Sequence, residues 1–147
     1  MLDTRTTPPP SAVTSLAASL DRYAPYLLSI LRIMAALLFM EHGLSKFFGF
    51  PAATPPPALF DLEWFAALIE FCGGALLTLG LFSRAAAFIM SGEMAIGYFM
   101  IHAPASFYPY INKGELAVMY CLVFLYFVFA GAGPVSLDAL IWRKRRG

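Results

Sequence analysis

Ionisable side chains are uncommon within and at the ends of long apolar segments, and eight of those that occur there in this chain are candidate functional residues. An ionisable group at the centre of a membrane-spanning helix costs at least ~2.5 kcal/mol. These groups therefore face a protein interior, pair with opposite charges or extend to the membrane surface. In a shared polar cavity they could carry protons or bind the polar head of a ligand. The cavity candidates are Arg32, His42, Lys46, Glu70, Glu93, His102 and Glu115, and the eighth residue is Glu41.

Two of the acidic residues, Glu70 and Glu93, lie far from the ends of their apolar segments. One interpretation is a buried polar network needed for folding, and the other is a direct role in chemistry or transport. Simpler roles also stay open for other members of the set. Arg32 and Lys46 could extend to opposite membrane surfaces, and Glu115 could merely begin a helix.

No sequence motif predicts a metal or a covalently bound cofactor. His42 and His102 lack the HxxxH or HxxE spacing that places metal ligands on one helix face. The chain also lacks a CxxCH motif or a cysteine cluster for haem or iron–sulfur attachment. Cys72 and Cys121 lie inside apolar runs, and we expect them to be buried, unreactive thiols.

The composition is typical of a membrane protein of one domain. Hydrophobic residues make up 60% of the 147 residues and charged residues 13%, against about 25% charged in a soluble domain. The mean hydropathy is +0.71. The formal net charge of +1 argues against a nucleic-acid partner. The hydrophobic composition makes the lipid bilayer the first predicted partner.

The apolar segments predict an all-α fold, an integral membrane four-helix bundle. We predict a disordered or surface N-terminal segment over 1–24, a four-span domain over 25–134 and a basic cytoplasmic tail over 135–147. The four spans are expected at about 26–48, 63–82, 85–102 and 115–130.

Both terminal regions carry signals for a short surface helix. Leu16, Leu20 and Tyr23 recur at helical spacing before Pro25, which indicates a short helix ahead of the first span. Near the other terminus, Ser136 can cap a short amphipathic helix.

Basic residues are distributed unevenly between the two predicted sides of the membrane. Three lie within residues 1–32, one lies at position 84 and four lie within 143–146, whereas only Lys46 and Lys113 fall on the other side. The positive-inside rule then places both termini in the cytoplasm. We therefore predict a multi-pass protein of the bacterial inner membrane.

This orientation assigns a depth to each ionisable group at 1.5 Å per residue. The acidic residues and histidines of the spans fall in the outer half or near the midplane, whereas Arg32 and Arg84 lie on the inner side. The arrangement predicts a polar cavity that opens to the outside. Glu41 points about 180° away from Arg32 on the first span, so we expect it to contact a partner protein or a second copy.

Several stretches in order resemble the DoxX family of small bacterial four-span membrane proteins. The resemblance extends from Leu31 to Leu140 and rests on FMEHGLSK (39–46), LIEFCGGALLTLGLFSRAAA (68–87), SGEMAIGYFMIHAP (91–104), INKGE (111–115) and GAGPVSLDAL (131–140). It implies a link to quinone- or sulfur-dependent redox systems, so a quinone is a possible ligand. Family members often carry an uncharged residue where this chain has Glu41, which supports a partner contact there.

Three functions follow from these observations. The first is an accessory subunit of a redox membrane system, at most an oxidoreductase subunit, because the chain has no evident redox centre of its own. The second is a small proton-coupled transporter that uses Glu70 and Glu93, and the third is a structural subunit of a larger membrane complex. The first and third are favoured, and both predict a homo-oligomer or a larger membrane assembly.

Overall fold

A computed structural model describes residues 12–145 of the chain, and all of the regular structure in that range is helical. The elements are α1 (Ala12–Phe48), α2 (Leu62–Leu79), α3 (Ser83–Gly97) with a π-helical turn η1 (Tyr98–His102), α4 (Pro109–Asn112), α5 (Glu115–Ala130) and α6 (Leu137–Arg145). The predicted all-α class is confirmed. Three helical segments are long and apolar enough to cross a membrane, namely Leu16–Phe48, Leu62–Leu79 and Ser83–His102. The predicted fourth span coincides with α5, an apolar helix of 16 residues.

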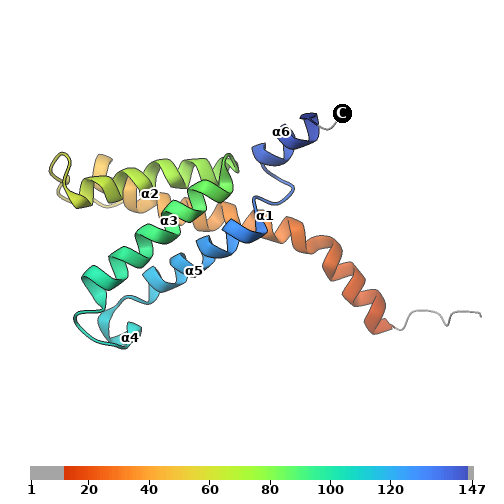
Figure 1. The fold of residues 1–147 in the computed structure, drawn as a ribbon, viewed down its shortest axis with the longest axis horizontal. Coiled ribbons are helices and arrows are strands. Elements are labelled where there is room, and N and C mark those ends of the chain that lie inside the picture. The colour runs from red at the N-terminus through yellow and green to blue at the C-terminus, as the bar shows by residue number, and fades with distance from the viewer. Residues whose placement is uncertain (1–11, 146–147) are drawn as a thin grey trace, which may run out of the picture.

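The long helices form two pairs that diverge from one end of the molecule. The most extensive contacts join α1 to α2 and α3 to α5, and α2 contacts α3 less extensively. Seen from the side, the two pairs form a V whose arms meet near the α2–α3 turn (Figure 1). Where the pairs meet, all the long helices contribute to one apolar core, which includes Phe39, Leu77, Met90, Phe124 and Phe127.

Glycine makes the close packing of α1 on α2 possible. A Cβ atom on Gly43 would lie 2.7 Å from the backbone nitrogen of Phe71. One on Gly74 would lie 2.7 Å from the Cβ atom of Met40. Neither position has room for a side chain, so both glycines are needed for the helices to approach this closely.

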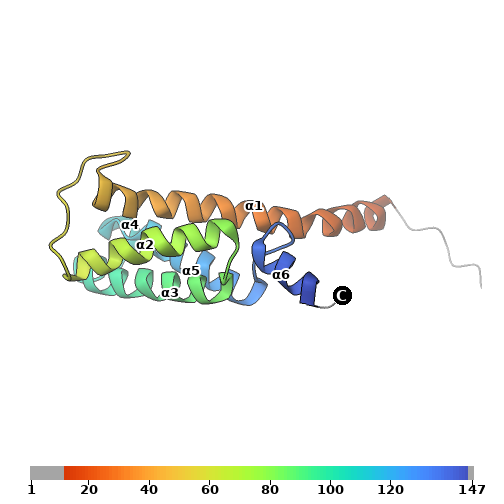
Figure 2. The same cartoon turned by 90° about the horizontal axis from the view of Figure 1, so that it is seen from above.

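The first helix differs from its prediction. It begins at Ala12 and continues through Pro25, in place of a short surface helix that ends before a separate span. The axis of α1 bends in this region (Figure 1), as proline inside a helix usually causes. The two helical patterns therefore form one helix of 37 residues, whose first part extends beyond the other long helices (Figure 2). Residues 1–11, predicted to be disordered, lie outside the described range.

The C-terminal helix α6 is attached to the α2–α3 turn. The Asp138 carboxylate accepts hydrogen bonds from the backbone nitrogens of Phe82 and Ser83, both at 2.9 Å, and so caps the start of α3. The Asp138 backbone nitrogen donates to the Gly80 carbonyl at 2.8 Å. The predicted cap is also present, since Ser136 Oγ accepts from the Ala139 nitrogen at 3.1 Å.

Candidate functional site

An ion pair between the first two helices forms the polar centre of the site. Lys46, in the last turn of α1, places its Nζ atom 2.8 Å from Oε1 of Glu70 in the middle of α2. Glu70 is 5% exposed, whereas Lys46 is half-buried. The contact depends on the close packing around Gly43, three residues before Lys46, which brings the two helices together at this level.

Glu93 of α3 is the unusual member of the group. Both of its carboxylate oxygens are buried and have no hydrogen-bond partner among the described residues. Glu93 interacts electrostatically with Glu70 and Lys46, and the second oxygen of Glu70 is also without a partner. Buried polar atoms nearly always have partners, and leaving one without a partner costs about 1–3 kcal/mol. The site therefore has hydrogen-bonding capacity that the described part of the chain does not use.

These three residues line a groove of about 810 Å³ between α2 and α3. The volume lies within the range of about 300–1,000 Å³ that is common for small-molecule sites. Asp61 and Glu63, where α2 begins, also line the groove, and its remaining walls are apolar. The apolar lining consists of Leu62, Phe65, Ala66, Ile69, Phe88, Ile89, Gly92, Met94, Ile96, Gly97, Met100 and Ile101.

Two glycines on α3 keep the groove open. A Cβ atom on Gly92 or Gly97 would have no atom within 4 Å. Neither glycine is therefore needed for helix packing, although glycine inside a helix costs roughly 0.5–1 kcal/mol relative to alanine. Sequence reasoning did not predict a groove between α2 and α3, and the signal that could have revealed it is the pair of glycines on the same helix as Glu93.

Arg32, one of the predicted cavity residues, lies elsewhere. Its guanidinium is 1% exposed and donates hydrogen bonds to the carbonyls of Leu77, Thr78 (2.9 Å), Ala132 (2.9 Å) and Val135 (2.7 Å). The side chain therefore joins the end of α2 to the segment between α5 and α6. Arg84 has a similar role, because it donates to the carbonyls of Val128 and Phe129 at the end of α5.

His102 and Glu115 also lie apart from the ion pair. The Nδ1 atom of His102 is 3.0 Å from the Asn112 carbonyl oxygen, and its ring stacks on Tyr98. Asn112 is buried and bonds to the Ser106 carbonyl and the Gly114 nitrogen, both at 2.8 Å. The His102 contacts therefore hold the loop before α5, while Glu115 is exposed in the first turn of that helix.

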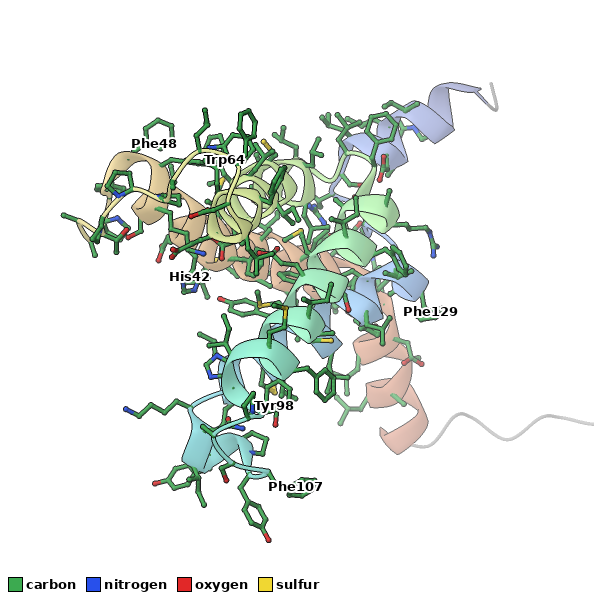
Figure 3. All side chains as sticks on the ribbon, turned by 60° about the vertical axis from the view of Figure 1, so that its left-hand side comes forward. His42, Phe48, Trp64, Tyr98, Phe107 and Phe129 are labelled. Carbon is green, nitrogen blue, oxygen red and sulfur yellow. The ribbon has the colours of Figure 1, made fainter. Side chains whose placement is uncertain are left out.

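His42 and Glu41 are both exposed on α1. The His42 ring lies 6.4 Å from the rings of Phe39 and Tyr120, measured between centroids. Figure 3 shows His42 on the α1–α2 arm and Tyr98 on the α3–α5 arm, on either side of the angle between the two pairs. His42 thus lies near the open end of the V but does not contact the ion pair.

The cysteine prediction is wrong for Cys72, which is exposed on the outward face of α2. Apolar surroundings in the sequence do not distinguish a lipid-facing position from a buried one, because both are apolar. Cys121 is half-buried, and its carbonyl accepts a hydrogen bond from Ser91 Oγ at 2.8 Å. The described residues contain no group of three or more His, Cys, Asp or Glu side chains that could hold a metal ion.

Comparisons with known proteins place the chain in a family. The DoxX family model matches residues 27–103. An uncharacterized protein of Haemophilus influenzae is 46% identical over 136 residues, which cover 86% of this chain and 98% of the relative. A second protein of that organism, also uncharacterized, is 30% identical over 127 residues, or 78% of this chain and 82% of the relative.

A more distant relative carries a functional name. The Bacillus subtilis protein named "Putative oxidoreductase CatD" is 23% identical over 121 residues, which cover 80% of this chain and 88% of the relative. No solved structure matches the chain. The family match, the close relative and the three long apolar helices lead to one conclusion: this chain is a membrane protein of the DoxX family.

Proposed function

We propose that this chain is an accessory component of a membrane redox system and binds a small amphipathic molecule in the groove between α2 and α3. Glu93 carries the proposal, because its two buried oxygens have no partner among the described residues and line the groove. A ligand with a carbonyl or hydroxyl head would supply the missing partner, and its apolar part would lie along the walls of α2 and α3.

A quinone fits this groove. A carbonyl oxygen of its head would accept a hydrogen bond from a protonated Glu93, and a hydroxyl group of its reduced form would donate one to the carboxylate. Its hydrophobic tail suits the apolar lining. A Cβ atom on Gly92 or Gly97 would meet no neighbouring side chain within 4 Å, so we expect a flat ring to lie beside these glycines. A bound quinone would supply electron- and proton-carrying capacity, while Glu93 would orient its head and Lys46–Glu70 would set the local charge.

The name of one relative supports a role in a redox system. The Bacillus subtilis relative carries the name "Putative oxidoreductase CatD". This chain has no evident redox centre, so electrons would come from a partner protein. Affinity purification from native membranes should recover an oxidoreductase subunit together with this chain. Recovery of the folded chain without such a subunit would count against the accessory role.

We further propose that α5 is a fourth span and that both termini lie in the cytoplasm of a bacterial cell, at its inner membrane. Along the sequence, eight of the ten lysines and arginines fall on one predicted side of the membrane, and Lys46 and Lys113 fall on the other. The groove then opens in the outer half of the membrane. A periplasm-active reporter inserted near Thr54 should give a signal and one fused after Gly147 should not, and the reverse pattern would refute this topology.

The ligand proposal is tested by quinone retention. Purified protein in lipid nanodiscs would be loaded with decylubiquinone, and the quinone retained after gel filtration would be measured. Gly97→Phe introduces a ring at a groove position where a Cβ atom would meet no neighbouring side chain, and it should lower retention several-fold, as should Glu93→Ala. Glu115→Gln, a change at an exposed position outside the groove, is the matched control and should retain quinone like the wild type. Equal retention by Gly97→Phe and wild type would refute the proposal.

A structural subunit is the second candidate function, and the exposure of Glu41 favours it. A carboxylate on the surface of a membrane helix calls for a protein neighbour. If Glu93→Ala and Gly97→Phe both support normal activity in the native system while Glu41→Leu does not, the structural role is the better account.

A further inference from the structure

One exposed stripe runs along α1 from its start to the outer half of the membrane. Its apolar members alternate at spacings of four and three residues, the seven-residue repeat of helices that pack side by side along their length. Each of them is at least 50% exposed. They are Leu16, Leu20, Tyr23, Leu27, Ile30 and Met34, and Glu41 follows one repeat after Met34.

The inner part of this stripe extends beyond the bilayer. α1 has 37 residues and is therefore about 55 Å long, against about 30 Å of hydrocarbon. Counted from Phe48, the hydrocarbon ends near Leu28, so Leu16 and Tyr23 lie about 8–18 Å outside it. Every residue from Leu16 to Leu27 is exposed within the described part of the chain, and Leu16, Leu20 and Tyr23 are 62–63% exposed. Large apolar side chains are thus left in a polar environment.

At the outer part of the stripe a polar side chain lies in an apolar environment. Glu41 is exposed, and it lies seven residues, or about 10 Å, below the outer end of α1. At this depth a carboxylate that faces lipid is costly. A lipid surface would cover the apolar inner part of the stripe but would leave the Glu41 carboxylate without a hydrogen-bond partner. A protein helix along the whole stripe would both cover the exposed apolar side chains and offer Glu41 a hydrogen-bond partner.

We propose that the occupant is a second copy of this chain, paired along the α1 stripes about a two-fold axis. A second copy brings a helix of the same length, pattern and orientation in the membrane, and two-fold pairs are the commonest assemblies. The apolar members of the two stripes then cover one another. The two Glu41 side chains lie near each other with His42 beside them, so the ring N–H of His42 in one copy donates a hydrogen bond to the Glu41 carboxylate of the other copy.

Other features of α1 suit this contact. Ala17 and Ala24 flank the stripe and are exposed, and their small side chains let a second helix approach closely. Pro25 lies on the opposite side of the helix from the stripe, so its ring does not interrupt the contact surface. Asp21 and Arg22 give the projecting part no net charge to repel a parallel copy.

Disulfide cross-linking in native membranes tests the proposal. Cys72 and Cys121 would be replaced by serine and alanine, and single cysteines would be introduced at Leu20 and Leu27 on the stripe. The controls are Ala18→Cys and Arg22→Cys, which are exposed on the same helix but off the stripe. Mild oxidation should yield disulfide-linked dimers several-fold faster at the stripe positions than at the controls. Equal rates at all four positions, or no dimer at either stripe position, would overturn the proposal.

A second measurement covers the outer end of the stripe. Two differently tagged copies would be expressed together and solubilised in mild detergent, and their co-purification measured. Glu41→Leu and Leu20→Asp should each lower co-purification several-fold, whereas Ala18→Asp should not. The arm from Leu16 to Leu27 is exposed throughout, so these arm variants leave the bundle intact. Undiminished co-purification of both stripe variants would refute the two-fold contact and leave the quinone groove unaffected.

Discussion

Replacement of Arg32 by alanine should strongly destabilise the fold. The guanidinium is 1% exposed and donates to four carbonyl groups, on Leu77, Thr78, Ala132 and Val135. Hydrogen bonds to charged groups contribute about 1.5–3 kcal/mol each, and a buried acceptor left without a partner costs about 1–3 kcal/mol. We therefore expect Arg32→Ala to lower the free energy of unfolding by about 3–5 kcal/mol, a large share of the 5–15 kcal/mol typical of a domain.

The loss is measured by thermal and denaturant unfolding of purified protein in detergent. Arg32→Lys keeps the positive charge but cannot reach four acceptors at once, so it should fall between wild type and Arg32→Ala. Arg22→Ala removes an exposed arginine from the same helix and is the matched control, which should unfold like the wild type. If Arg32→Ala and Arg22→Ala unfold at the same temperature, Arg32 does not hold the ends of α2 and α5 together.

Three further predictions follow from the helix contacts. Asp138→Ala removes the cap of α3 and should cost about 1–2 kcal/mol, visible as a lower unfolding temperature, with Asp138→Asn intermediate. Gly43→Ala should lower folded yield because α1 cannot approach α2, whereas Gly97→Ala should be neutral or stabilising by up to about 1 kcal/mol; equal yields would contradict the packing account. Glu70→Gln leaves Lys46 without its charged partner and should lower the unfolding temperature below that of the wild type; thermal unfolding in detergent measures the difference.

The positions of the helices were predictable because apolar runs and the glycine or proline residues that end a helix can be read directly from short stretches of sequence. The predicted span over 115–130 coincides with α5, and the glycines and proline after it end the helix where expected. The helix after Ser136 was also foreseen from its cap. The sequence did not predict that α1 continues through Pro25, since proline occurs both in the first turn of a helix and inside a bent helix.

Only part of the site was predictable from the sequence. The depth of a residue in the membrane gives its level along the helix axis but does not say which residues of other helices lie next to it. Depth placed both Lys46 and Glu70 in the outer half of the membrane, and the structure pairs them. Depth gives no information on which acceptors a long side chain reaches, so the four carbonyls around Arg32 had no sequence signal. The groove depends on the divergence of α2 from α3, which the angle between two helix pairs determines.

Photolabelling in native membranes tests the ligand site most directly. A quinone analogue with a photoreactive group on its tail would be activated by light, and the labelled peptides identified by mass spectrometry. The label should fall on the groove walls, at residues such as Ile89, Ile96 and Met100 of α3 or Phe65 of α2, and excess decylubiquinone should compete it away. Labels spread over α1 and α5, or labels on α2 and α3 that decylubiquinone does not reduce, would contradict a quinone site in this groove.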